Sequence, residues 1–472
     1  MTEPNICLRI DSLRLENFRC FAACDLNLHP TLTVLVAENA QGKTALLDAL
    51  RLGLQEFVTT VGRGKQPRGF DRTDIHLKRG NQDVMESHLP TSLKVSGQAD
   101  GESVTWRRSL SKDSFHARTS TKETKDIRRI AKRLADKPDV NANHPSESPT
   151  VLPVVAYYGT GRLYDQHRLT EGKRWLAEEA SPVRVSAYLD CLSPSSSYKS
   201  FSAWFGQKWE QVSDPRFRAV GFEARPENHI AAVRDAVSTV LEPTGWATIV
   251  WEPASQDAAG QNRSPGYIAL EHSLKGQLPL THLSDGVRNM VALVGDLAHR
   301  CVRLNPFFGQ DAAKRTPGIV LIDEVEMHLH PRWQQLVIGL LSSAFPCVQF
   351  VMSTHSPQVL TTVKRESIRI LGNDVGGAWS SSAPAEETKG VESSTALIEV
   401  MGVNPVPPVE ESQWLSEYTA LIEDGTHDTE QGQHLRTKLN SHFGAQHPLI
   451  LDCERLIRFQ NFKRLKSTTL EN

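Results

Sequence analysis

The 472-residue sequence lacks the features that mark secreted and membrane-spanning proteins. Its seven cysteines are scattered and form no CxxC pair, so we expect reduced thiols rather than a disulfide framework or a zinc site. No stretch approaches the roughly 18 consecutive apolar residues that a membrane span needs, and the N-terminus has no apolar segment typical of a signal peptide. We therefore expect a cytoplasmic protein.

A strong net charge and long coiled-coil repeats are also missing. The formal net charge is −2, with 23% charged and 39% hydrophobic residues, which is typical of a globular protein. Attraction to phosphates would therefore have to come from local patches. Residues 60–280 contain no sustained heptads, which argues against a long coiled-coil arm. The length allows roughly two or three domains.

A phosphate-binding loop is predicted near the start of the chain. The β-branched run at 31–36 (TLTVLV) predicts a buried strand, and it leads directly into AENAQGKT at 37–44 and an apolar helical pattern. Strand, tight loop and helix form the context in which GxxxxGK[ST] binds phosphate, although a chance GKT is the alternative. Lys43 would reach the β- and γ-phosphates of ATP, and Thr44 would hold Mg²⁺. Ala37 replaces the first glycine, which only a negative φ tolerates. The residues expected to bind ATP are Asn39, Ala40, Gln41, Gly42, Lys43, Thr44 and Ala45.

Two later strands carry polar residues at their ends. IVLIDE at 319–324 predicts a central parallel strand, and CVQFVMS at 347–353 predicts another, followed by THSP. Ligands bind at the carboxyl ends of strands in open α/β sheets. Asp323 would support Mg²⁺, Glu324 would orient or deprotonate the attacking water, and His355 would contact the γ-phosphate or its water. A solvated acidic pair and a structural histidine are the alternatives. The upstream loop makes the first less favoured, and the acidic strand and helix that precede His355 make the second less favoured.

A second anion site is predicted at the start of another helix. LSDGVR at 283–288 precedes an apolar-periodic segment from 290 to 301. Ser284 fits an N-cap position, Asp285 follows it, and Gly286 permits a close backbone approach. The two phosphate-binding helix ends need not meet in one chain. In a head-to-tail pair, each could complete the nucleotide site of the other.

This order of motifs resembles the ABC-type ATPases of the SMC, RecF and OLD group. EVEMHLHP at 324–331 is similar to an element of the OLD and RecF-like branch, and LENFRCF at 15–21 resembles their entry strand. In that family the arginine of this strand, here Arg19, lies near the nucleotide. PVVAYYGTGRL at 153–163 and the stretch at 188–205 are similar to PtuA-type ATPase subunits of Septu and retron anti-phage defence systems.

The resemblance implies an α/β fold, namely an ABC-type P-loop ATPase head with a mixed central sheet, a mostly helical insertion and a helical C-terminal region. The expected head comprises 1–60 and 278–372, the insertion 61–277, a linker 373–394 and a partner-binding region 395–472. It also implies ATP hydrolysis with Mg²⁺ in an ATP-dependent dimer or higher oligomer that regulates a separate HNH-type, PtuB-like nuclease. Nucleic acid, or a retron reverse transcriptase with its msDNA, is a further candidate partner. The substitutions at Ala37 and Asp285 suggest slow turnover.

Other functions remain as alternatives at this point. They are a RecF-like DNA repair or DNA-binding ATPase, an OLD-like ATPase with a degenerate nuclease, and, less favoured by the motif spacing, a transporter ATPase. OLD nucleases carry a DxD in a metal site after the ATPase half, and no DxD follows His355. We therefore expect that this chain does not cut nucleic acid itself.

A basic segment and several helices complete the sequence-based picture. Lys and Arg dominate 107–133, which predicts either a nucleic-acid patch or a solvated helix face. A hairpin is expected around Asp100, and Arg162 in the GTGR turn either approaches the nucleotide or belongs to a turn held by glycines. The residues of the candidate patch are Arg128, Arg129, Lys132 and Arg133. Helices are expected at 197–213, 226–241, 331–344, 411–424, 428–443 and 447–466.

Overall fold

The chain forms two compact units, Met1–Met401 and Gly402–Asn472, each with its own hydrophobic core. The computed structural model describes residues 8–62, 69–79, 84–113, 119–136, 149–162, 184–193, 198–212, 225–253, 255–256, 262–264, 266–373 and 379–470. All six cysteines within these ranges are free thiols, as expected. None of the helices in the described ranges has the length and apolarity needed to span a bilayer.

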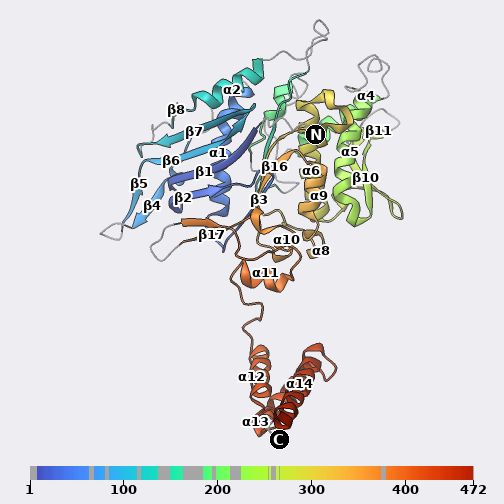
Figure 1. Ribbon diagram of the computed structural model, residues 1–472. Helices are drawn as coiled ribbons and strands as arrows, with labels where there is room; N and C mark the ends of the chain where they lie inside the picture. The colour runs from blue at the N-terminus through green and yellow to red at the C-terminus, as the bar shows by residue number, and fades with distance from the viewer. Residues whose placement is uncertain are drawn as a thin grey trace. The chain divides into compact units, whose positions relative to one another are not determined.

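A six-stranded sheet forms the centre of the first unit, in the order β18-β17-β3-β16-β15-β9. Figure 1 labels its strands β3, β16 and β17. Its strands pair in parallel except for the edge pair β17 and β18. The strands are β3 (Leu32–Val36), β9 (Val154–Tyr158), β15 (Gly318–Ile322), β16 (Val348–Ser353), β17 (Ile368–Asn373) and β18 (Trp379–Ser382). Every residue of β9, β15 and β16 is buried, because strands covered on both faces are apolar throughout. The predicted strands at 31–36, 319–324 and 347–353 are confirmed.

A second, antiparallel sheet has the order β2-β1-β6-β7-β8. It consists of β1 (Leu8–Phe18), β2 (Phe21–Asn27), β6 (Thr91–Ala99), β7 (Glu102–Leu110) and β8 (Ser120–Glu123). The predicted hairpin is the β6–β7 turn, where Asp100 and Gly101 both have positive φ, as a tight two-residue hairpin requires. Helix α1 (Lys43–Val61) contacts both β6 of this sheet and β15 and β16 of the central sheet. The helix that follows the phosphate-binding loop is therefore packed between two sheets.

Further helices lie on the side of the central sheet that faces away from α1. Helix α5 (Pro226–Leu241) packs against α4 (Tyr198–Val212) and α6 (Asp285–Leu304). The expected helices at 197–213 and 226–241 are confirmed. The second half of the insertion also contains an antiparallel sheet of β10 (Trp246–Glu252), β13 (Tyr267–His272) and β14 (Gly276–Pro279), which we did not predict. Its strands are short and partly exposed, so their apolar pattern is weak.

Three segments differ from the sequence-based expectations. The expected insertion at 61–277 contains β9, which pairs with β15 inside the central sheet. The expected helix at 331–344 is interrupted at 335–336 and forms α8 (Pro331–Gln334) and α9 (Val337–Ala344). The expected linker at 373–394 contains β18, whose Trp379 packs edge-on against Phe21 and donates its indole N–H to the Cys20 carbonyl over 3.1 Å. Long-range pairing of short apolar or aromatic segments explains two of these differences.

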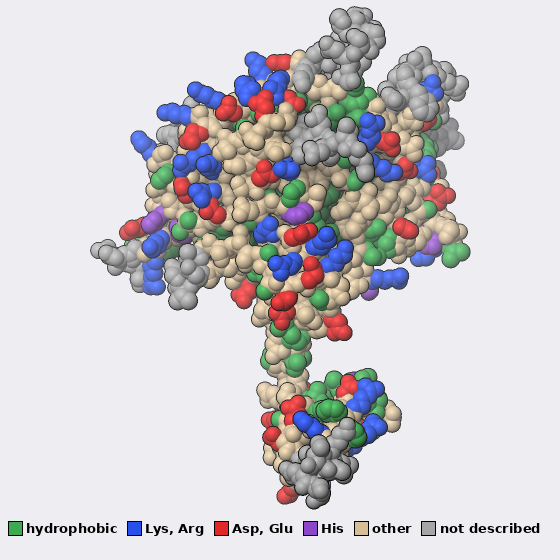
Figure 2. Space-filling view, viewed as in Figure 1, with side chains coloured by type: hydrophobic (Ala, Val, Ile, Leu, Met, Phe, Trp, Pro, Cys, Tyr) green, Lys and Arg blue, Asp and Glu red, His purple; other side chains and the backbone are tan. Residues whose placement is uncertain are grey.

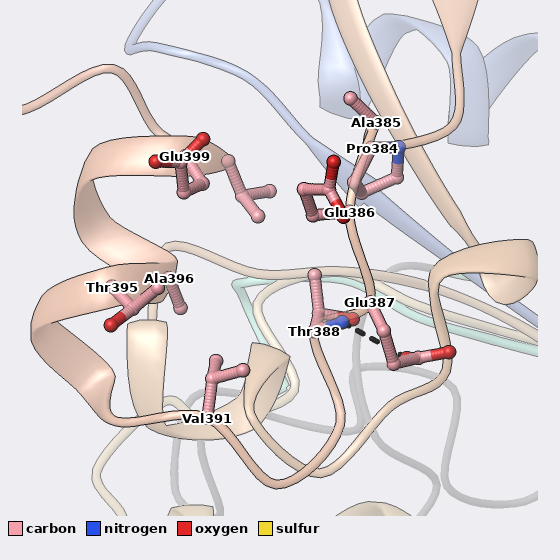
Figure 3. A pocket seen from close by; sticks show the side chains of 10 residues that line it. Pro384, Ala385, Glu386, Glu387, Thr388, Val391, Thr395, Ala396 and Glu399 are labelled. Carbon is pink, nitrogen blue, oxygen red and sulfur yellow. Dashed lines mark hydrogen bonds between the residues drawn. The ribbon is translucent and has the colours of Figure 1, made fainter.

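The remaining described elements are short or lie at the periphery. The α-helices and strands of the first unit in this group are β4 (His76–Arg79), β5 (Met85–His88), α2 (Lys125–Asp136), β11 (Ser255–Gln256), β12 (Asn262–Ser264), α7 (Ala312–Arg315), α10 (Pro357–Leu360) and α11 (Ser393–Glu399). Residues 384–400, including α11, enclose a hollow of about 30 Å³ lined in part by Glu386 and Glu399 (Figure 3). This hollow is too small to hold a nucleotide.

The second unit is a helical bundle. It consists of α12 (Glu410–Asp424), α13 (Glu430–Phe443) and α14 (Pro448–Leu470), which confirms the three helices expected in this region. Its buried core residues are Tyr418, Ile422, Leu435, Leu439, Ile450 and Cys453.

Candidate nucleotide site

Four loops follow adjacent parallel strands and meet at one edge of the central sheet. In the order β3, β16, β15 and β9, these strands lead into the phosphate-binding loop, the His355 segment, the Asp323 segment and the GTGR turn. Parallel strands present all their carboxyl ends at the same edge, which is where open α/β sheets bind ligands. The topology therefore brings together residues that lie far apart in the sequence.

The phosphate-binding loop depends on backbone conformations that favour small residues. Gly42 precedes α1 with φ 86°, and an added Cβ would lie 2.4 Å from the Phe21 ring, so only glycine fits there. Ala37 is not one of the described residues with positive φ. An alanine in place of the first glycine of the GxxxxGK[ST] pattern therefore causes no backbone strain. Ala40 instead lies at φ 62°. The strained departure from the pattern is therefore at Ala40, which sequence analysis missed because it weighed only the first glycine.

The loop surrounds a buried lysine. The Lys43 ammonium donates to the carbonyls of Ala37 over 2.8 Å and Glu38 over 3.0 Å, and its side chain is almost fully buried. Burial lowers the pKa of Lys43, while the carboxylates of Asp323, Glu324 and Glu326 raise it. No side chain caps the start of α1, so its first amides remain available to an anion. This arrangement suits a phosphate group.

Thr44 and Asp323 form the centre of the site. The Thr44 hydroxyl donates to one Asp323 carboxylate oxygen over 2.8 Å, and the Ser353 hydroxyl donates to the other over 2.5 Å. Asp323 is only 1% exposed, so these bonds hold its carboxylate in one orientation. Mg²⁺ prefers oxygen ligands and is commonly held by one or two protein groups together with substrate phosphates. Thr44 and Asp323 supply such a pair, and the residues therefore fit Mg²⁺.

Glu324 lies next to this pair in a left-handed backbone conformation. Its φ is 49°, which is costly for a residue with a Cβ. Its N–H donates to the Ser353 hydroxyl over 2.8 Å. The Glu324 side chain is half-buried, so its carboxylate remains within reach of water.

His355 is held by a residue that sequence analysis missed. The Glu326 carboxylate accepts hydrogen bonds from the main-chain N–H of His355 over 2.5 Å and from the Thr354 hydroxyl over 2.9 Å. Glu326 is the second glutamate of EVEMHLHP, so the sequence pattern contained it. Its hydrogen-bond partner His355 follows a different strand, β16, so no sequence pattern indicated their contact. The structure thus places His355 beside the Asp323–Glu324 segment.

The two arginines considered in the sequence analysis have partners within the chain. Arg19 forms ion pairs with Asp48 over 2.7 Å and Asp74 over 2.9 Å, and Asp48 lies one turn after Thr44 in α1. Arg162 is 4% exposed and donates to main-chain carbonyls. Contact of Arg19 with a nucleotide stays a prediction. Arg162 binds the Gly159 carbonyl of its own turn and also the backbone of the acidic segment that follows β15 (residues 323–331). Its approach to a nucleotide stays a prediction.

The second predicted anion site lies at the start of α6. Ser284 occupies the N-cap position, is exposed and makes no capping hydrogen bond. Asp285 pairs with Arg288 in the next turn. A Cβ added to Gly286 would lie 2.5 Å from the His328 carbonyl, so this chain itself requires glycine there. Among the described hydrogen bonds and ion pairs, none joins Ser284, Asp285 or Gly286 to the phosphate-binding loop.

The candidate nucleic-acid patch is largely paired. Arg128 binds the fully buried Glu56 over 2.6 Å, Arg129 binds Glu102 over 2.7 Å, and Arg133 binds Glu102 over 2.6 Å. Figure 2 shows acidic side chains among the basic ones over this part of the surface. These pairs reduce the free positive charge of α2, and nucleic-acid binding there stays a prediction.

Comparison with known proteins gives a family match. The family described as "AAA domain, putative AbiEii toxin, Type IV TA system" matches residues 32–361. This range begins with β3 and ends just after α10, so it contains all four loops of the candidate site.

Three of the similar curated proteins are from retron and Septu systems. The retron Vc95 probable ATPase of Vibrio cholerae serotype O1 biovar El Tor is 35% identical over 93% of this chain and 88% of its own length. The retron Ec83 probable ATPase of Escherichia coli is 23% identical over 94% of this chain and 86% of its own length. The Septu protein PtuA of Bacillus mycoides is 44% identical over 78 residues, which are 16% of this chain and 10% of the length of PtuA. An SMC head bound to the C-terminal winged-helix domain of ScpA is similar with a TM-score of 0.44 and 14% identity, over 80% of this chain and 98% of that chain.

Proposed function

Since the chain belongs to this AAA-domain family, as an ABC-type ATPase of defence systems, we propose that it binds and hydrolyses MgATP as the regulatory subunit of an anti-phage complex. The observation that carries the proposal is the hydrogen bond between Thr44 and Asp323, with Glu324 beside them. When bound, Mg²⁺ would neutralise phosphate charge at this pair. Lys43 would exchange its carbonyl partners for phosphate oxygens, and Glu324 would orient the attacking water.

We further propose that ATP joins two copies head to tail. Ser284 is exposed at the start of a 20-residue helix without a capping bond, which supports an anion contact to a nucleotide held by a second copy. ATP binding would then favour the paired state, and hydrolysis would release it.

The experiment that tests both points uses Glu324→Gln, which keeps the size of the side chain but removes its negative charge. We expect wild-type protein to release phosphate from ATP, and the variant to lose nearly all of this activity and to form an ATP-dependent dimer in sizing with light scattering. Ser284→Arg in the same background should abolish that dimer but leave nucleotide binding to the monomer intact. If the Glu324→Gln protein hydrolyses ATP like wild type, the assigned site is wrong.

We also propose that the regulated partner is a separate HNH-type nuclease and that it docks on the unit Gly402–Asn472. Two phenylalanines of α14, Phe459 and Phe462, are 61% and 56% exposed. They lie among the cations Arg458 and Lys463. This combination supports docking of a protein with an acidic, apolar surface.

Affinity purification from the native operon, followed by mass spectrometry, tests this assignment. Phe459→Asp should remove the nuclease subunit from the purified complex without changing the ATPase rate, and Asn461→Asp on the same turn serves as the matched control. Recovery of a reverse transcriptase or nucleic acid instead of a nuclease would contradict the nuclease assignment.

A further inference from the structure

Arg162 is buried at the carboxyl edge of the central sheet and binds only main-chain oxygens in its described contacts. Its guanidinium donates to the carbonyls of Gly159 over 3.1 Å, of Glu324 over 2.5 Å, and of Asp323. Burying a cation is costly unless it is compensated. Burial lowers the pKa of Arg162 to about 10, while the nearby carboxylates raise it, so the side chain is protonated at neutral pH.

The other two carbonyls belong to Asp323, which we propose supports Mg²⁺, and to Glu324, which we propose orients the attacking water. The planar guanidinium has several N–H groups in a fixed fork, and here two of its nitrogens bind consecutive peptide groups, those of Asp323 and Glu324. An ammonium is a point charge on a flexible stem and lacks this paired geometry. Arg162 therefore fixes the orientation of the peptide that links the proposed metal-binding residue to the proposed catalytic residue.

The same peptide carries backbone strain that needs support. Glu324 has φ 49°, a conformation that costs roughly 1–2 kcal/mol for a residue with a side chain. Such residues persist only where their surroundings hold them. The Ser353 hydroxyl accepts the Glu324 N–H over 2.8 Å, and Arg162 donates to its carbonyl. Because φ at Glu324 sets where Cβ points, these two bonds set the direction of its carboxylate.

We infer that Arg162 is a positioning residue that holds Glu324 in its left-handed conformation and so aims the carboxylate at the attacking water. The inference rests on the proposed function of Glu324. It predicts that Arg162 acts on the rate of the chemical step and has little effect on ATP binding, since the described contacts of its guanidinium are with its own turn and the acidic segment and not with the phosphate-binding loop.

The test compares kcat and KM for ATP in full-length wild type, Arg162→Lys, Glu324→Gln and the double variant. We expect Arg162→Lys to lower kcat by at least about tenfold while KM changes less than about threefold. The double variant should hydrolyse ATP no more slowly than Glu324→Gln alone, because residues that act as a unit are not additive. Equal losses in both backgrounds, or a loss of ATP binding, would overturn the inference in favour of a structural role.

A matched control separates activity from folding. Arg108 is 1% exposed, donates to the Leu52 carbonyl and pairs with Glu56 away from the site, so Arg108→Lys should lower Tm without changing kcat per folded molecule. Rates are normalised to the sites that bind a fluorescent ATP analogue. If Arg162→Lys folds poorly, Arg162→Gln takes its place, and failure of both to bind nucleotide overturns the inference. Absence of hydrolysis in wild type would instead refute the proposed ATPase activity.

Discussion

The hydroxyl of Thr44 donates to the carboxylate of Asp323 over 2.8 Å, although the two residues are 279 positions apart. Thr44 lies in the first turn of α1, the helix that follows β3, and Asp323 follows β15. The strand between them, β16, contributes Ser353, which holds the other Asp323 oxygen. Three neighbouring strands thus build one oxygen-lined position.

The first prediction concerns Mg²⁺ at this position. Thr44→Ala removes the hydroxyl that would contact the ion, so we expect ATP hydrolysis to fall by at least about tenfold. The concentration of Mg²⁺ that gives half the maximal rate should also rise. Thr44→Ser keeps the hydroxyl and is the control. Equal Mg²⁺ titrations for the alanine and serine variants would show that Thr44 does not contact the metal.

The second prediction concerns strain in the phosphate-binding loop. Ala40 lies at φ 62°, which costs roughly 1–2 kcal/mol with a Cβ, whereas glycine loses about 0.5–1 kcal/mol more chain entropy on folding. Ala40→Gly should therefore raise the free energy of unfolding by up to about 1 kcal/mol in urea denaturation. Ala37→Gly should lower it, because Ala37 has no strain to relieve. The opposite order would contradict this account.

The third prediction concerns the contact between α6 and the acidic segment. Gly286→Ala would place a Cβ 2.5 Å from the His328 carbonyl, and we expect a loss of about 1–3 kcal/mol in the free energy of unfolding. Gly339 in α9 has open space around its Cα, so Gly339→Ala should stabilise by up to about 1 kcal/mol. Thermal denaturation of both variants distinguishes packing from helix propensity, and a stable Gly286→Ala protein would refute the close packing.

The fourth prediction concerns acid sensitivity. Burial lowers the pKa of His229 to about 4, with Lys208 adding to the shift, while the Pro306 carbonyl opposes it. The folded state therefore keeps His229 neutral, whereas the unfolded chain takes up a proton below about pH 6.5. The stability due to His229 is present above about pH 6.5 and is lost as the pH falls towards about 4.

His229→Gln removes this titration. The stability difference between variant and wild type should shift by about 2 kcal/mol between pH 7 and pH 5, in favour of the variant at low pH. Urea denaturation at both pH values measures it. A constant difference would mean that His229 does not titrate between these values.

The fifth prediction concerns the basic segment. Arg129 and Lys132 are exposed, whereas Arg128 is bound to the buried Glu56. If α2 contacts phosphates, Arg129→Gln with Lys132→Gln should weaken nucleic-acid binding and flatten its salt dependence by about one unit of slope per lost contact. Arg128→Gln should mainly lower Tm. Unchanged binding by the double variant would assign the segment to a solvated helix face.

The sequence by itself determined the local elements and the chemistry at their ends. Buried strands such as β15 and helices such as α5 follow from apolar runs and periodicity, which depend on neighbouring residues. The loop at 37–44 and the acids at 323–324 were visible for the same reason. Strand ends in an α/β sheet are where ligands bind, so the pattern also indicated the class of ligand.

Only the tertiary structure decided which of these ends meet and what supports them. The pairing of β9 with β15 delivers Arg162 to the carbonyls of Asp323 and Glu324, and the order of the strands places Glu326 beside His355. Strand order depends on contacts between distant segments, whose closure is not encoded in any local window. The same holds for Thr44 and Asp323, which become one site only because β3, β16 and β15 lie next to one another.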